Sequence, residues 1–195
     1  MRMIGRGFAL AGMAAVLAGC AMVPAATGGA NAALLAAPDC APAEGLRFIC
    51  GTGAVEELAA IPGSDWLIAG NLDVGAGARL RLIDTSQMTV ADLPVDLASP
   101  APVSPDCPGP PDPARWSISG LAVDAVALGA PLLYLVNHGS QRMGIEVFDL
   151  DLSGPLPLAR WRGCAVMPEG TLPNALAPDG FGGADVISFH APRDG

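Results

Sequence analysis

Apolar and polar residues follow one recurring order along the chain from residue 56 onward. Each unit begins with a short apolar segment, a turn and a strongly apolar segment. It continues with a second turn and an alternating segment, and it ends with an edge segment. The first unit comprises residues 58–70, 78–84 and 89–94. Alternation with a period of two, as over 78–84, is typical of a half-buried strand. The pattern predicts a small antiparallel sheet.

The same order recurs in the rest of the chain. The second unit is made of segments at residues 120–124, 131–138, 144–151 and 158–162. A third unit begins at residue 174 and reaches residue 189, and Leu58, Leu121 and Leu176 mark equivalent points. Repeats of four strands are typical of propeller blades. The sequence therefore predicts an all-β fold with about two and a half blades of a β-propeller, and a generic antiparallel sandwich is the alternative.

The units are too few for a closed propeller, because such rings have about four to eight blades. An open ring leaves sheet edges unpaired and part of the core exposed. We therefore expect the chain to be a fragment of a longer protein or the product of a truncated gene.

The N-terminus has the features of an export signal. Arg2 and Arg6 precede an apolar run over residues 7–18, and Gly19 and Cys20 follow it. Residues 17–20, Leu-Ala-Gly-Cys, resemble the bacterial lipobox, which implies cleavage after residue 19 and lipidation of Cys20.

This reading divides the chain into a signal peptide over residues 1–19, an Ala-, Gly- and Pro-rich tether over 20–44 and a propeller domain over 45–195. Ala21 after the lipidated cysteine favours the outer membrane, with the domain facing the periplasm. The alternative is cleavage near residues 30–32, which would release a free periplasmic protein.

The charge of the chain excludes one class of partner. The formal net charge is −9, and all of the cationic side chains are arginines. Binding to nucleic acid needs a dense positive surface for phosphate contacts. We therefore expect no nucleic-acid partner, and the membrane contact is expected through the lipid on Cys20.

The cysteines of the predicted exported part suggest disulfides. Cys40, Cys50, Cys107 and Cys164 would lie in an oxidising compartment, and their number is even. Three pairings are possible. We favour the local pairing of Cys40 with Cys50 and of Cys107 with Cys164.

Several short segments resemble a known family in order and spacing. They are residues 53–58 with 62–63, 132–138 with 144–149, 161–168, and 172–174 with 178–180. They resemble the paraoxonase/arylesterase family and the gluconolactonase-like superfamily (senescence marker protein type). The resemblance covers about residues 45–190, which correspond to the first half of that fold. It implies a six-bladed propeller that holds calcium in its central tunnel.

The resemblance also implies roles for individual residues. Glu56 and Asn174 would bind the catalytic calcium, and Glu57 would lie at a second, structural calcium. His138 would be the outer histidine of a pair that activates water. Carboxylate and amide oxygens are hard ligands of the kind calcium prefers, and a bound cation stabilises the oxyanion formed when water attacks an ester.

Two departures from the family pattern weaken the prediction that this chain is catalytically active. Ser119 stands where the family has its first histidine, and Ala175 stands where it has an aspartate. A serine cannot act as a general base at neutral pH. No Gly-x-Ser-x-Gly motif occurs, so serine-based catalysis has no support either.

The expected function is an envelope-anchored, calcium-dependent hydrolase of small esters or lactones in which catalysis is weakened or lost. The alternatives are a non-catalytic propeller that binds or scaffolds other molecules in the envelope, and a degenerate gene fragment.

Overall fold

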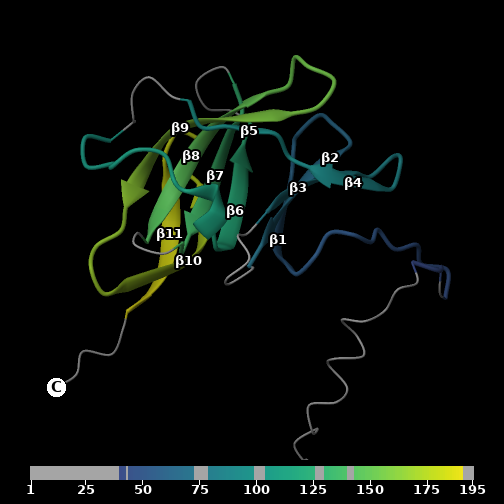
Figure 1. Ribbon diagram of the computed structural model, residues 1–195, viewed down its shortest axis with the longest axis horizontal. Helices are drawn as coiled ribbons and strands as arrows, with labels where there is room; N and C mark the ends of the chain where they lie inside the picture. Colours follow the sequence, from purple (N-terminus) through teal and green to yellow (C-terminus); the bar gives the residue numbers. More distant parts are fainter. Residues whose placement is uncertain are drawn as a thin grey trace, which may run out of the picture. The chain divides into compact units, whose positions relative to one another are not determined.

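The computed structural model describes residues 40–42, 44–72, 79–98, 104–125, 130–139 and 143–190 (Figure 1). The predicted signal peptide, Cys20 and most of the predicted tether lie outside the described residues. The described part is all-β, as predicted, with one short 3-10 helix at Pro113–Arg115. Its strands form three separate sheets, and none of these closes into a barrel. Within these residues, no helix has the length and apolar character needed to cross a bilayer.

The first sheet is a four-stranded antiparallel meander that confirms the first predicted unit. Its strands are β1 (Val55–Ala60), β2 (Trp66–Asn71), β3 (Leu80–Asp84) and β4 (Thr89–Asp92), in that order. Ser64 closes the turn between the first two strands, because its hydroxyl donates to the Ile61 carbonyl at 2.8 Å. Between β3 and β4, the Asp84 carboxylate accepts bonds from the backbone N–H groups of Ser86 and Gln87, at 2.9 and 2.8 Å.

The second sheet confirms the second unit and has one unexpected strand. It contains β6 (Ile118–Asp124), β7 (Leu132–Asn137), β8 (Gly144–Asp151) and β9 (Leu158–Val166). The additional strand is β5 (Val95–Asp96), which pairs in parallel with β9 at the edge of this sheet. Every residue of β7 is buried, as expected for a strand covered on both faces.

The third sheet is the hairpin of β10 (Thr171–Pro178) and β11 (Ala184–His190). The Asp179 carboxylate organises its turn by accepting bonds from the backbone N–H groups of Phe181 at 2.7 Å and Gly183 at 2.9 Å. These bonds hold the pKa of Asp179 below its ordinary value. Glycine suits this turn because Gly180 and Gly182 both adopt positive φ angles.

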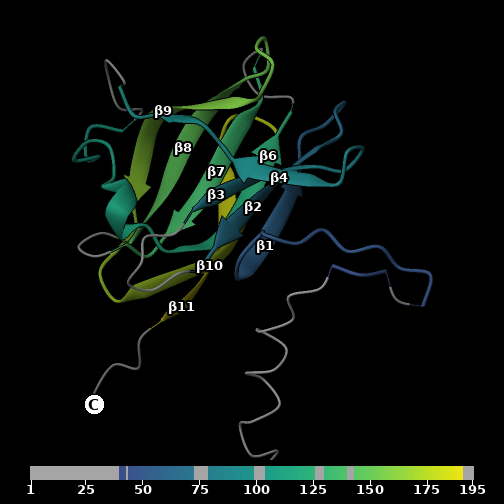
Figure 2. The same ribbon diagram turned by 45° about the vertical axis from the view of Figure 1, so that its right-hand side comes forward.

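The first strands of the three sheets lie against one another, with β6 in contact with both β1 and β10 (Figure 2). Two glycines permit the close approach. A Cβ at Gly70 would lie 2.7 Å from Ile118 Cγ2, and a Cβ at Gly120 would lie 2.5 Å from the backbone oxygen of Asn174. The second sheet therefore lies between the other two.

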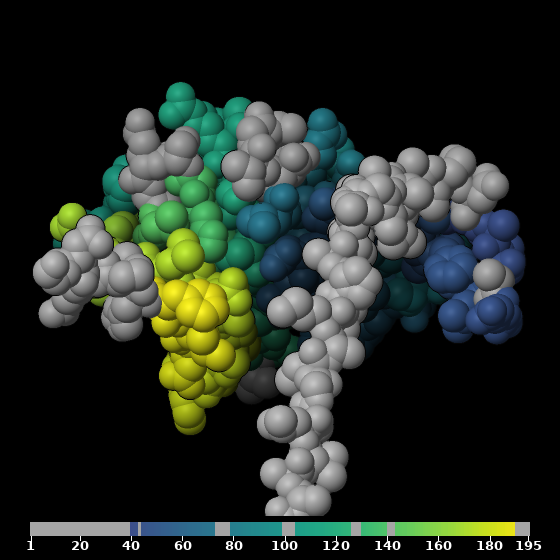
Figure 3. All heavy atoms as spheres, turned by 90° about the horizontal axis from the view of Figure 1, so that it is seen from below, coloured from purple at the N-terminus to yellow at the C-terminus, as the bar shows by residue number. Residues whose placement is uncertain are grey.

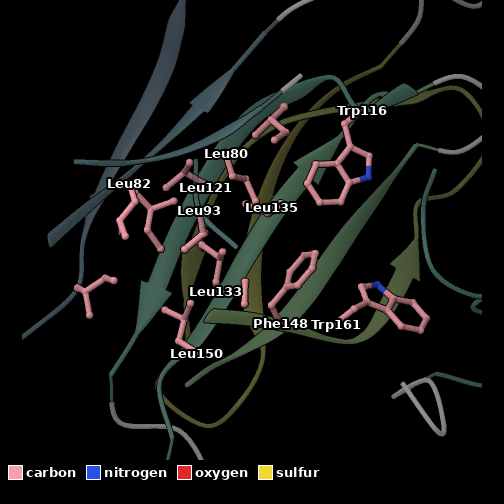
Figure 4. Packing of buried hydrophobic residues seen from close by; sticks show 14 of the residues in the cluster. Leu80, Leu82, Leu93, Trp116, Leu121, Leu133, Leu135, Phe148, Leu150 and Trp161 are labelled. Carbon is pink, nitrogen blue, oxygen red and sulfur yellow. The ribbon is translucent and has the colours of Figure 1, made fainter. Parts of the chain in front are cut away.

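Two apolar clusters fill the spaces between these sheets. The larger cluster joins the first and second sheets and includes Leu82, Leu133 and Phe148 (Figure 4). Within it, Trp116 packs edge-on against Phe148 with ring centroids 6.1 Å apart. The smaller cluster joins the second and third sheets. Its members are Leu132, Tyr134, Val136, Ile145 and Val147, with Leu176, Ala184 and Val186 packed against them.

Both predicted disulfides are confirmed. Cys40 bonds to Cys50, and Cys107 bonds to Cys164. The second bridge joins the segment before β6 to strand β9, across a separation of 57 residues. Closing a loop of this length stabilises the fold by about 4 kcal/mol in the chain-entropy account.

Candidate functional site at three β-bulges

Each of the three first strands contains a β-bulge. The register of β1 with β2 shifts between Val55 and Glu57, so Glu56 has no partner across the ladder. Ser119 in β6 and Asn174 in β10 are bypassed in the same way. A bulge of this kind redirects a side chain without ending the strand, and bulges are over-represented next to active sites.

The three bulges occupy equivalent positions. Glu56, Ser119 and Asn174 each stand two residues before the repeat leucines at 58, 121 and 176. Because β6 contacts both β1 and β10, the Ser119 bulge lies on the strand between the other two. Three neighbouring strands thus carry one carboxylate, one hydroxyl and one amide at the equivalent positions of their bulges.

A hydrogen-bond network connects the second and third bulges. The hydroxyl of Ser119 lies 3.2 Å from His138 Nε2 and donates to the Asn174 backbone oxygen at 3.4 Å. His138 Nε2 also bonds to the backbone oxygen of Pro173. Ser119 is buried and His138 is half-buried, so the network is largely shielded from solvent.

The partners of His138 assign its tautomer. A carbonyl oxygen can only accept a hydrogen bond, so the bond to Pro173 requires a proton on Nε2. In the neutral ring the lone pair is then on Nδ1. Nε2 therefore cannot accept the Ser119 proton, and the pair is not a serine nucleophile with its base.

A second network, built on the buried side chains of Asn137, Glu146 and Trp161, fixes the backbone around His138. Asn137 Oδ1 accepts a bond from the Gly139 backbone N–H at 2.8 Å, and Asn137 Nδ2 donates to Glu146 Oε1 at 3.1 Å. Trp161 Nε1 donates to Glu146 Oε2 at 2.9 Å. Only glycine fits at position 139, because a Cβ there would lie 2.2 Å from the Arg115 backbone oxygen.

Sequence reasoning missed the roles of Asn137 and Glu146. The available signal was Asn137 at the end of the strongly apolar strand β7 and Glu146 between the apolar residues Ile145 and Val147 of β8. Such residues must find partners when buried. Both lie in the segments that carry the family resemblance, which gives no role to either residue.

Asn71 occupies the position in the first sheet that Asn137 occupies in the second. Asn71 pairs with Val55, just before the Glu56 bulge, as Asn137 pairs with Ile118 before the Ser119 bulge. Asn71 Nδ2 donates to the Thr52 backbone oxygen at 3.0 Å. Its Oδ1 is buried, with no hydrogen-bond partner in the described part of the chain.

The residues proposed as metal ligands differ in exposure. Glu56 and Asn174 are exposed, and Glu57 is half-buried. The described residues contain no cluster of three or more His, Cys, Asp or Glu side chains placed to hold a metal. The available donors are therefore hard oxygens from carboxylate and amide groups, which suit calcium in type but fall short of the about six to eight that it takes.

No protein-family model and no curated protein matches this chain. A functional assignment therefore rests on the sequence and on the geometry of the site.

Proposed function

We propose that this protein is an exported, lipid-anchored propeller hydrolase that binds calcium and cleaves small esters or lactones. The main support is an agreement between the residues that the resemblance selects and the positions of the bulges. The family resemblance selects Glu56 and Asn174 as ligands and position 119 as a catalytic position, and all three are bulged residues of adjacent strands. The resemblance rests on the order of short sequence motifs, whereas the bulges are a property of the strand register.

The donors at the bulges fit calcium in chemistry. Glu56 offers a carboxylate and Asn174 an amide oxygen. Asn71, whose Oδ1 has no hydrogen-bond partner among the described residues, faces Val55 across the ladder, just before Glu56. When bound, calcium would polarise the carbonyl of the substrate and stabilise the oxyanion. Glu57 remains the proposed contact of a second calcium.

His138 is the residue proposed to move a proton. With Nε2–H held by the Pro173 oxygen, the lone pair on Nδ1 can accept a proton from water. The Asn137–Glu146 network fixes the backbone on both sides of the ring and so limits its movement. Ser119 binds the Asn174 backbone and supplies no base, so the proposed activity is weak.

The test is hydrolysis of phenyl acetate and of a simple δ-lactone by the full chain, with and without excess chelator. The proposal expects slow turnover that chelator abolishes and added calcium restores. Ser119→His, which restores the second imidazole, should raise the rate by about 100-fold or more, the usual contribution of a general base. Full activity in excess chelator would contradict the proposal.

A second candidate function is a non-catalytic binding module in the envelope. The observation favouring it is that Ser119 and His138 Nε2 both bond to the backbone of β10, where they can serve to join two sheets. Under this reading the folded chain shows no esterase activity with or without calcium, and Ser119→His creates none.

A further inference from the structure

The first disulfide encloses a segment that lies at the surface. We call residues 40–50 the disulfide loop. Residues 41, 42 and 44–48 of this loop are exposed, and so is Cys50. None of its described residues belongs to either apolar cluster. Figure 3 shows this part of the chain, in dark blue, at the outer surface of the molecule. The loop therefore contributes little to the core of the domain.

Arg47 lies in the disulfide loop and is exposed. Its neighbours Leu46 and Phe48 are 60% and 47% exposed. A turn at residues 44–45, where both φ angles are positive, directly precedes Leu46. Exposed loops of this kind are preferred sites of proteolysis. Arg47 is the only arginine in residues 7–78, and the chain has no lysine. A protease specific for basic residues therefore has a single cleavage site between the predicted lipidation site and the first sheet.

Cleavage at this position leaves the folded domain whole. Hydrolysis adds water across the peptide bond between Arg47 and Phe48, which leaves a carboxylate on Arg47 and an amino group on Phe48. The first strand of the described structure begins later, at Val55. The bond from Asn71 Nδ2 to the Thr52 backbone oxygen also lies after the cut. All three sheets therefore stay together in the C-terminal piece.

The disulfide keeps the two pieces connected after such a cut. Cys40 lies before Arg47 and Cys50 lies after it, and the Cα atoms of the bonded cysteines are 6.0 Å apart. The described residues before the cut are exposed apart from the half-buried Cys40, so they bury little surface against the domain. The covalent bond is thus the main connection between the cleaved pieces, and its reduction separates them.

The two disulfides differ in their access to a reductant. Cys107 and Cys164 are 7% and 0% exposed and belong to the larger cluster, whereas Cys50 is exposed. The rate of thiol–disulfide exchange depends on this access. A thiolate of a dithiol attacks Cys50 Sγ, the disulfide breaks, and Cys40 leaves as a thiolate. The second thiol then attacks the mixed disulfide, which frees Cys50 and oxidises the dithiol. A dithiol therefore opens the loop before it reaches the buried bridge.

We propose that the disulfide loop is a release site that needs two events. A protease specific for basic residues cleaves after Arg47, and a dithiol reduces the bond between Cys40 and Cys50. Either event alone leaves the domain attached, because the peptide chain and the disulfide are two parallel connections between the anchor and the first sheet. The release rests on the lipid anchor of the proposed function, whereas it does not depend on the proposed hydrolysis.

The test uses the lipidated full chain on phosphatidylcholine vesicles, with trypsin as the protease and dithiothreitol as the dithiol. Trypsin alone should cleave after Arg47 and leave the domain in the vesicle pellet, and dithiothreitol alone should release nothing. Both together should move a domain that begins at Phe48 to the supernatant, with its buried disulfide intact by mass. Arg47→Gln should abolish this release. Arg79→Gln is the matched control and should not, because the Arg79 side chain is also exposed.

Three outcomes overturn the proposal: no cleavage after Arg47 in the folded chain, release by trypsin alone with the disulfide intact, or retention of the cleaved and reduced chain in the pellet. The double variant Cys40→Ser/Cys50→Ser gives a second check, since trypsin alone should release its domain. A chain that does not pellet before digestion shows that the lipid anchor is wrong. Gel filtration of the same digests then tests the loop, because the cleaved chain should elute as one species before reduction and as two after it.

Discussion

The Ser119 hydroxyl donates a hydrogen bond to the backbone oxygen of Asn174 at 3.4 Å, and both residues are the bulged positions of neighbouring strands. The bond joins the second sheet to the third at the point where both strands depart from regular pairing. The third sheet is a hairpin of two strands, which is marginally stable by itself. Contacts of this kind and the smaller apolar cluster are what hold it in place.

Ser119→Ala should therefore loosen the hairpin more than the rest of the fold. The loss of one partly buried hydrogen bond costs about 1 kcal/mol. Amide hydrogen exchange should show faster exchange in β10 and β11 and unchanged exchange in β2 and β3. Ser188→Ala is the matched control, since that hydroxyl bonds only to the adjacent Phe189 carbonyl in the described structure. Uniform acceleration across all three sheets would contradict this prediction.

Glu146→Ala should be among the most destabilising single changes in the domain. The substitution leaves Asn137 Nδ2 and Trp161 Nε1 buried without their acceptor, at a cost of about 1 to 3 kcal/mol for each group. Glu146→Gln keeps the volume and one acceptor oxygen, so it should cost less. Urea unfolding of the three proteins measures the order, and equal midpoints for wild type and Glu146→Ala would contradict the account.

Tyr134→Phe should be neutral or stabilising. The Tyr134 hydroxyl is buried and has no hydrogen-bond partner among the described residues, so the wild type bears a desolvation cost of about 1 to 3 kcal/mol that phenylalanine avoids. Burial, and then the negative charge of Asp124, raise the pKa of Tyr134 above 10.0.

This pKa shift gives the tyrosine a pH signature. A group whose pKa is raised in the folded state binds its proton more tightly there, so its contribution is fully present below pH 10 and is lost as pH rises through the folded pKa. The wild type should lose stability above pH 10, and Tyr134→Phe should lose less. Chemical unfolding from pH 8 to pH 11 measures both, and identical slopes for the two proteins would contradict the assignment.

Replacing Cys107 and Cys164 together by serine should lower stability by about 4 kcal/mol, because this bridge closes the longer of the two disulfide loops in the described residues. The Cys40–Cys50 bridge closes a much shorter loop, so its removal should cost about 3 kcal/mol or less. Thermal unfolding of the two double variants tests this ranking. A larger loss from the shorter bridge would contradict it.

Much of the fold could be predicted from the sequence because its strands alternate clearly. The segments 78–84 and 144–151 correspond to β3 and β8 in the structure. Both disulfides were also predicted. Strand β5 was missed, since Val95 and Asp96 are too few for a periodic signal and pair with a strand far along the chain.

The site was only partly predictable. Short motifs suggested roles for Glu56, His138 and Asn174. A bulge depends on the register of two paired strands, so the sequence of one strand does not reveal it. The bond from His138 to Pro173 joins residues 35 positions apart in the sequence, and its acceptor is a backbone oxygen. No pattern of side chains could therefore predict it. The same holds for the bond from Ser119 to the Asn174 backbone, because the sequence shows only that a serine stands where the family has a histidine.

The most direct test of the central claim is the thermal unfolding of the full chain with and without 10 mM calcium, about an order of magnitude above a weak site's dissociation constant. A native-state ligand at about ten times its dissociation constant stabilises by about 1.4 kcal/mol, which raises the Tm by about 3 to 5 °C for a domain of this size. The account predicts this rise in the wild type and in the exposed control Glu169→Gln, and its loss in Glu56→Gln and Asn174→Ala. No rise in the wild type, or the same rise in all four proteins, would contradict a calcium site at the bulges.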